Sequence, residues 1–217
     1  MNLTLPEQVY LCTYAFQKKK FPSALIQHRG QRMRAAALAQ LVIEGQAATD
    51  GSRVRQAGGT GPSDPFLASV WGELAEGPKK WMPMVHNTGH TAEGPVSDQL
   101  LAAGIIEKKG SRSLNPLAGS KFALSRTEEA TAVQEALHAN VTRHADPAAL
   151  ALAEVALPVI VLESDATMGI VLDRTERRAS RDTVEAFSDR FDREIPGLRS
   201  ALTNSVLANR AVGGGWG

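Results

Sequence analysis

Apolar positions recur at helical spacing over most of the chain. The stretch "LPEQVYLCTYAF" predicts a helix from Leu5 to Phe16, for which Thr4 has the side chain of an N-cap. The stretch "QRMRAAALAQLVIE" predicts a second helix from Gln31 to Glu44, and Gly45 is the kind of residue that ends one. Both stretches carry enough apolar residues on one side to pack against the rest of the protein.

Turn signals divide the remaining chain. "QAATDGSRVRQAG" predicts a β-hairpin with Asp50-Gly51 at its turn. A helix ending at Gly104, the strand "GIIEKKG" and the returning strand "KFALS" predict a second hairpin with its tip at residues 110–120. "GGTGPSDP" and "NTGHTAEGP" are expected as loops, and "KKWMPMVHN" as the start of a short helical piece. Further helices are expected at residues 64–76, 127–143, 146–163, 168–172, 180–194 and 196–210.

These elements predict a mainly α protein. We expect a single compact helical domain over residues 1–212, with one or two β-hairpins, and a flexible glycine-rich tail at residues 213–217. The 217 residues are enough to bury a sizeable core, and neither a repeat nor a long linker divides them.

Composition narrows the classes of function. The formal net charge of +1 argues against a protein held on nucleic acid by phosphate neutralisation, so no nucleic-acid partner is expected. No run reaches the ~18 apolar residues of a membrane span. Cys12 is the only cysteine and is expected to be a buried thiol. The start lacks the basic opening of a signal peptide, and we expect a cytoplasmic protein.

Several common catalytic and cofactor motifs are missing from the sequence. "GGTGPSDP" lacks the Lys-Ser/Thr ending of a phosphate-binding loop, and no Gly-x-Ser-x-Gly serine elbow occurs. His86 and His90 stand four positions apart in "HNTGH", but no third metal ligand is evident. The sequence therefore predicts neither a metal nor another cofactor.

Basic residues give the clearest functional signal. Arg29, Arg32 and Arg34 follow the lysines at 18–20, and a guanidinium matches the geometry of phosphate, sulfate or carboxylate. With Arg34 in the first turn of its helix, free backbone N–H groups would help to hold an anion. The alternative is solvated surface charge. Trp81, which follows two lysines, and His86 are further candidate ligand-binding residues.

Two residues are candidates for catalysis. Glu154 has almost wholly apolar neighbours in "LALAEVALP", and a buried carboxylate there could serve as a general acid or base. The alternative is a carboxylate on a helix surface. His90, in the histidine-bearing loop, is the second candidate, as a proton acceptor.

The chain resembles the Golgi phosphoprotein 3 family over roughly Leu3 to Leu162, as a divergent, actinobacterial-type member. The resemblance rests on the order of several pieces: "LTLPEQVYLCTY", "LAQLVIEGQ" with its hairpin, "TGPSDPFLASVWGEL", "KKWM", "DQLLAAGIIEKK" and "KFALS". It implies a compact, mostly helical domain with a prominent hairpin that serves self-association. Eukaryotic members of that family bind phosphatidylinositol 4-phosphate in a pocket that uses a tryptophan and three arginines.

Carried over by position, one of those arginines falls on Arg34. The tryptophan falls near Leu25, and the other two arginines fall near His90 and Glu93. The resemblance therefore implies a concave site lined by Arg34, Arg32 and the histidine-bearing loop, without the full phosphoinositide clamp.

Three functional hypotheses follow. The first is an anion-recognising domain that binds a phosphate- or sulfate-bearing small molecule or lipid headgroup near Arg34, with possible peripheral membrane contact. The second is a metal-free enzyme of bacterial specialised metabolism that eliminates sulfate or phosphate or closes a ring, with His90 and Glu154 as its catalytic residues. The third is a partner protein that forms homo- or hetero-oligomers through the 110–120 hairpin. Whether the protein is an enzyme stays open at this point.

Overall fold

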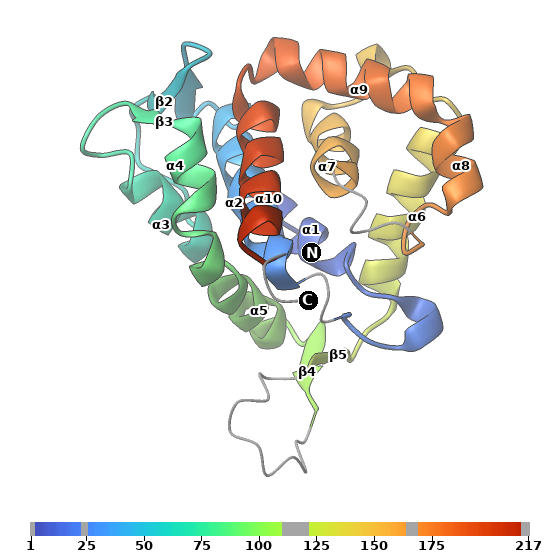
Figure 1. Ribbon diagram of the computed structural model, residues 1–217. Coiled ribbons are helices and arrows are strands. Elements are labelled where there is room, and N and C mark those ends of the chain that lie inside the picture. Colours follow the sequence, from blue (N-terminus) through green and yellow to red (C-terminus); the bar gives the residue numbers. More distant parts are fainter. Residues whose placement is uncertain (1–2, 23–25, 110–121, 164–168, 214–217) are drawn as a thin grey trace.

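The computed structural model of the protein describes residues 3–22, 26–109, 122–163 and 169–213 (Figure 1). It is mainly helical, as predicted. The α-helices are α1 (Leu5–Leu11), α2 (Ile26–Ile43), α3 (Pro65–Gly72), α4 (Trp81–His86), α5 (Glu93–Ala102), α6 (Glu128–Thr142), α7 (Leu152–Leu162), α8 (Arg174–Ala179), α9 (Arg181–Glu194) and α10 (Leu198–Gly213). Short 3₁₀ turns are η1 (Phe16–Lys18), η3 (Gly89–Thr91) and η4 (Pro147–Ala149).

Two small antiparallel sheets accompany the helices. The first has the order β1 (Ala47–Thr49), β2 (Arg53–Gln56), β3 (Lys79–Lys80), and it confirms the hairpin predicted around Asp50-Gly51. Its third strand was not expected, because a two-residue strand leaves no periodic signal. The second sheet pairs β4 (Ile106–Lys108) with β5 (Phe122–Leu124), which confirms the two strands of the second hairpin. Its tip at 110–120 lies outside the described residues.

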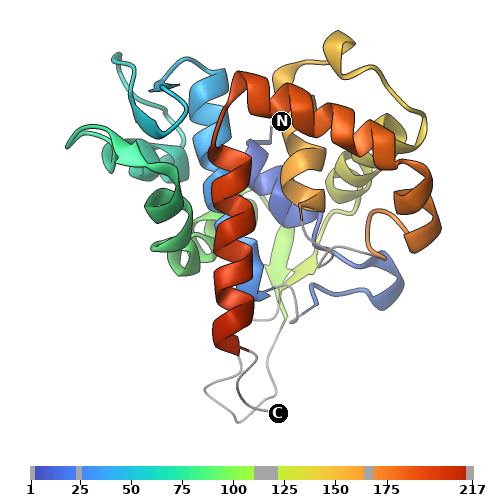
Figure 2. The ribbon, with the colours of Figure 1, turned by 45° about the horizontal axis from the view of Figure 1, so that its top comes forward.

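Helix α2 occupies the centre of the fold. It contacts α1, α3, α4, α7 and α10, and Figures 1 and 2 both show α10 running alongside it. Met33 and each residue from Ala35 to Ala39 are fully buried. The four alanines among them present little bulk, so neighbouring helices can approach α2 closely on several sides.

Helix α1 ends at Leu11 instead of continuing to Phe16, whereas its predicted N-cap is confirmed: Thr4 and Glu7 form a reciprocal capping box. The early end has a tertiary cause. Gln134, from α6, donates hydrogen bonds of 2.9 Å to the carbonyls of Leu11 and Tyr14. These contacts satisfy carbonyl groups that a longer helix would have used internally.

Helix α2 begins at Ile26, before the predicted Gln31, and its predicted end at Gly45 is confirmed, since Gly45 has a positive φ of 71°. Gly30 lies inside the helix because this position packs directly on η3. A Cβ there would lie 1.8 Å from the carbonyl oxygen of Gly89. The early start places Arg34 in the third turn of α2, not the first.

Other boundaries also differ from the prediction. The helix expected to reach residue 76 ends at Gly72, and the helix expected at 146–163 is η4 followed by α7. The helix expected at 168–172 is wrong: from Gly169 on, the chain forms a turn in which the Gly169 N–H donates to Leu172 O at 2.8 Å. The loop "NTGHTAEGP" instead contains η3 and the start of α5, and α8 was not expected.

The predicted helices at 127–143, 180–194 and 196–210 are confirmed as α6, α9 and α10. Residues 214–217 of the expected tail lie outside the described residues. Within the described residues, no helix combines the length and apolarity needed to cross a lipid bilayer.

Candidate functional site

Arg34 lies inside the protein, with only 2% of its surface exposed. Its two terminal nitrogens contact both carboxylate oxygens of Glu73, at 2.7 and 2.6 Å. Its Nε donates to the carbonyl oxygen of Met84 at 2.9 Å. The guanidinium thus links α2 to Glu73 at the C-terminal end of α3 and to Met84 in α4. The expectation that free N–H groups of a first helical turn surround it is wrong.

Arg29 and Arg32 are buried as well. Arg29 pairs with Glu93 at 2.6 Å, and its guanidinium carbon lies 4.9 Å from the ring centre of Tyr10 and 5.8 Å from that of Phe21. Arg32 has no exposed surface at all. Solvated surface charge is therefore wrong for all three arginines, because each lies within the folded core. Leu25, the carried-over tryptophan position, lies outside the described residues.

Trp81 and His86 connect α4 to the last helix. Trp81 is buried, and a Cβ on Gly197 would lie 2.8 Å from its ring, so the indole packs against the segment that leads into α10. The Nδ1 atom of His86 lies 3.0 Å from the hydroxyl oxygen of Ser205 on α10. The structure therefore gives both residues contacts within the protein.

His90 and Glu154 are exposed in different parts of the fold. His90 belongs to η3, while Glu154 lies in the first turn of α7 and accepts the backbone N–H of Ala151 at 2.9 Å. Glu154 is thus the helix-surface carboxylate of the alternative interpretation, with a capping role. Among the described side chains, no group of three or more His, Cys, Asp or Glu residues is placed to hold a metal ion.

A pocket of about 500 Å³ lies beside the Arg34 ion pair. It is formed where β2, β3, the end of α3 and α4 meet. Its lining residues are Arg53, Gly72, Glu73, Glu76, Pro78, Lys79, Lys80, Pro83, Met84, Asn87 and Thr88. Glu73 and Met84, the two residues that Arg34 contacts, belong to this lining. Arg34 therefore lies behind one wall of the pocket, while His90 and Glu154 do not line it.

The pocket places two cations side by side. Arg53 and Lys80 are direct partners in the antiparallel register of β2 and β3, and both are exposed. Lys79 pairs with Glu76 at 2.8 Å, and Glu73 is engaged by Arg34. In the described part of the chain, neither Arg53 nor Lys80 has an ion-pair partner at its charged end.

The nearest acid in sequence, Asp50, feels the charge of Arg53 but forms no ion pair with its charged end among the described residues. Asp50 accepts the backbone N–H groups of Arg53 and Ser52, at 2.8 and 2.9 Å, and these bonds lower the pKa of its carboxyl. Like charges directly opposite in a sheet are destabilising. The pair of Arg53 and Lys80 is thus an arrangement that the fold alone does not favour.

Sequence reasoning missed several residues of this pocket. Arg53, Glu73 and Asn87 carry no distinguishing signal, although the doublet Lys79-Lys80 stood out as basic. The alternation within "SRVRQ" does place Arg53 on the exposed side of its strand, with Val54 buried. The alternation could not identify the partner strand, in which Lys80, the register partner of Arg53, lies 27 residues further along the chain.

Comparison with known proteins places the whole fold in a family. The family model of Golgi phosphoprotein 3 (GPP34) matches residues 5–204, which extend from the start of α1 into α10. A search of the curated proteins found no match. Since the matched region covers most of the chain, the protein belongs to the Golgi phosphoprotein 3 (GPP34) family.

Proposed function

We propose that this protein is an anion-recognising domain that binds a phosphate- or sulfate-bearing small molecule or headgroup in the pocket beside Arg34. The proposal rests on one observation: Arg53 and Lys80 lie opposite each other on the pocket wall without an ion-pair partner among the described residues. An anion between them would relieve their repulsion and accept charge-assisted hydrogen bonds from both.

The rest of the pocket fits such a ligand. Its volume of about 500 Å³ lies in the range of small-molecule sites. Asn87 and Thr88 add neutral polar groups to the lining, and Met84 and Pro83 add apolar surface. A ligand with one anionic group and a compact organic body would find partners for both parts.

Arg34 has a positioning role in this proposal. Glu73, whose side chain is 35% exposed, lines the pocket and would repel an anion there. Both of its oxygens are held by the Arg34 guanidinium, so its negative charge is compensated from behind the wall. Arg34 thereby limits the repulsion that Glu73 would otherwise exert on an anion.

The enzymatic alternative draws no support from the positions of its two catalytic candidates. His90 and Glu154 are exposed, and neither lines this pocket. Peripheral membrane contact and association through the 110–120 hairpin remain predictions, since that hairpin tip lies outside the described residues.

The test is a titration of the full chain at low ionic strength. Inorganic phosphate, sulfate and pyrophosphate are titrated by calorimetry, and phosphatidylcholine vesicles with and without phosphatidylinositol 4-phosphate are used in flotation. Arg53→Gln and Lys80→Gln should each weaken binding about ten-fold, the effect of roughly 1.4 kcal/mol from one charge-assisted hydrogen bond. The matched control is Arg55→Gln, on the same strand and exposed, but outside the pocket lining.

The outcomes separate the possible sources of the anion. If the protein binds the soluble anions but not the vesicles, the ligand is a free small molecule. If it binds only the vesicles that contain the phosphoinositide, the ligand is a lipid headgroup. The proposal is wrong if none of these probes binds, or if Lys80→Gln and Arg55→Gln bind with the same affinity.

A further inference from the structure

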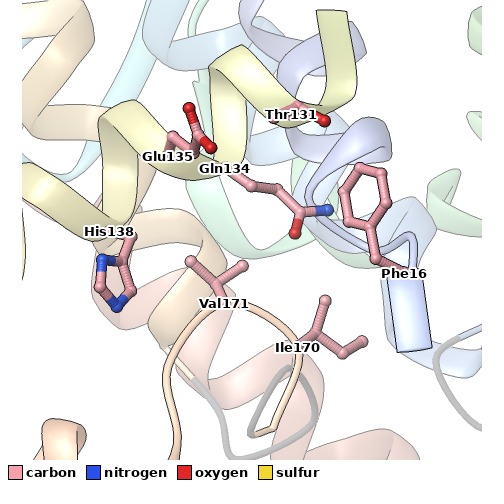
Figure 3. Close-up of a pocket in the computed structure, with 7 residues that line it drawn as sticks. All are labelled: Phe16, Thr131, Gln134, Glu135, His138, Ile170 and Val171. Carbon is pink, nitrogen blue, oxygen red and sulfur yellow. The ribbon is translucent and has the colours of Figure 1, made fainter. Parts of the chain in front are cut away.

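A second pocket, of about 400 Å³, lies on α6, between η1 and the turn that precedes α8 (Figure 3). Its lining residues are Phe16, Thr131, Gln134, Glu135, His138, Ile170 and Val171. None of these residues belongs to the basic pocket, and none was singled out by the sequence. The two pockets can therefore be tested separately.

Apolar side chains form two sides of this pocket. Phe16 is 36% exposed, and with Leu207 it is one of two large hydrophobic side chains that the described part of the chain leaves exposed. Ile170 and Val171 border the same space from the turn before α8 (Figure 3). The pocket therefore offers an aromatic face and two branched aliphatic side chains to an apolar ligand.

Gln134 presents a hydrogen-bond acceptor to the same space. Both hydrogens of its amide are used, since Nε2 donates to the carbonyls of Leu11 and Tyr14 at 2.9 Å each. These two bonds fix which end of the amide is the oxygen. Figure 3 shows Oε1 on the side of the helix where Ile170 and Val171 lie. Among the described residues no group donates a hydrogen bond to this oxygen, so it is available to accept one from an N–H group of a ligand.

Among the described residues that line this pocket, Glu135 is the only acid, and none is a lysine or arginine. Glu135 is exposed in its lining, and Glu176 lies next to it through a contact of 2.9 Å with His138. The backbone N–H of Asp173, and then His138, lower the pKa of Glu176. Among the described residues, no lysine or arginine belongs to the lining of this pocket, although lysines at 18–20 follow Phe16 in the chain. Ligands with a positive charge are therefore favoured over anions.

We propose that this pocket binds a small organic amine. Its apolar body packs between Phe16 and the pair Ile170 and Val171, and its ammonium group donates to Oε1 of Gln134, while the exposed carboxylate of Glu135 in the lining adds negative charge. This site is independent of the proposed anion site, because it uses other residues, another face of the fold and the opposite charge.

The test uses the full chain and three probes that separate the two parts of the ligand. They are 2-phenylethylamine, 3-phenylpropionate with the opposite charge, and ethylamine without the ring, each titrated by ligand-observed NMR. 2-Phenylethylamine should bind saturably. The other two should each bind at least about ten-fold more weakly, because each lacks either the charge or the apolar contact.

Substitutions at exposed positions are expected to leave the fold intact. Phe16→Ala should weaken the binding of 2-phenylethylamine about five-fold, because the ring contact is lost. Glu135→Gln should weaken it about three-fold, because an exposed charge is lost. The matched controls are Leu207→Ala and Glu185→Gln, which remove an exposed apolar and an exposed acidic side chain elsewhere and should leave affinity unchanged.

A blocking variant completes the test. Thr131→Phe places a ring into the pocket from α6 and should abolish binding, while circular dichroism reports an unchanged helix content. The inference is overturned by an absence of saturable binding of 2-phenylethylamine, by equal affinity for 3-phenylpropionate, or by unchanged affinity in Phe16→Ala.

Discussion

Arg34 and Glu73 form a two-point ion pair in which the cation is buried and the carboxylate lines a pocket. The two partners therefore face different surroundings. Arg34 is only 2% exposed, so water can hardly replace its partner, whereas the side chain of Glu73 is 35% exposed. Removal of the carboxylate leaves an uncompensated buried charge, so the pair is part of the structural core as well as of the site.

Glu73→Gln should lower the free energy of unfolding by about 2 kcal/mol, because a neutral amide cannot compensate the buried guanidinium. Urea denaturation at neutral pH measures this. Glu76→Gln is the matched control: Glu76 also pairs with a cation, but its side chain is 81% exposed, so little change is expected. Equal stability of the two variants would show that Arg34 does not need Glu73.

Gly30→Ala should destabilise the protein by about 3 kcal/mol, because its methyl group would overlap the backbone of Gly89 where α2 packs on η3. Gly72→Ala is the control, since a Cβ at that helical position meets nothing within 4 Å and should stabilise by about 0.5 kcal/mol. Thermal unfolding of both variants checks the difference. A tolerated Gly30→Ala would contradict the close approach of the two backbones.

Burial raises the pKa of the Glu163 carboxyl above its ordinary 4.5. A hydrogen bond donated by the Thr203 hydroxyl and the charge of Arg199 lower this pKa, but by less. The folded state then holds this proton more tightly than the unfolded chain does. Its contribution to stability is fully present below pH 4.5 and is lost as pH rises through the raised folded value.

Glu163→Gln removes that titration. The unfolding free energy of the variant relative to the natural chain should therefore increase as pH rises from about 4 to 7, in urea denaturation at a series of pH values. Glu176→Gln should show the opposite slope, because the Asp173 N–H and His138 lower the pKa of Glu176. The same slope in both variants would rule out this assignment.

Lys80→Gln should stabilise the fold by about 0.3 kcal/mol at low ionic strength, since it removes a like charge directly opposite Arg53. The same variant is expected to weaken anion binding, so stability and binding would move in opposite directions. Added salt should reduce the stability difference by screening the two exposed charges. A destabilising Lys80→Gln would indicate a structural role for the lysine.

Cys12 should resist thiol reagents in the folded protein. The side chain is fully buried, which confirms the sequence prediction, and burial raises the pKa of its thiol. Since the thiolate is the reactive form, labelling with a chromogenic disulfide should be slow in buffer and stoichiometric in denaturant. Rapid labelling under native conditions would show that α1 opens readily.

Local features of the sequence determined the starts and ends of many elements. Thr4 caps α1, Gly45 ends α2, and the Asp50-Gly51 turn joins β1 and β2. Each depends on hydrogen bonds or backbone angles within a few residues, so the local pattern was sufficient. The order of such pieces along the chain was also sufficient to indicate the family that the comparison confirmed.

Only the tertiary structure decided what the arginines do. Arg34 pairs with Glu73, which is 39 residues away in the sequence, and Arg29 pairs with Glu93. Helix α1 ends where Gln134 of α6 donates a hydrogen bond to the carbonyl of Leu11. The sequence gives the position of an arginine, but it does not show whether its guanidinium contacts a carboxylate of the same chain or a ligand. Its partner depends on how distant segments pack, and the same packing brought Arg53 opposite Lys80 and created both pockets.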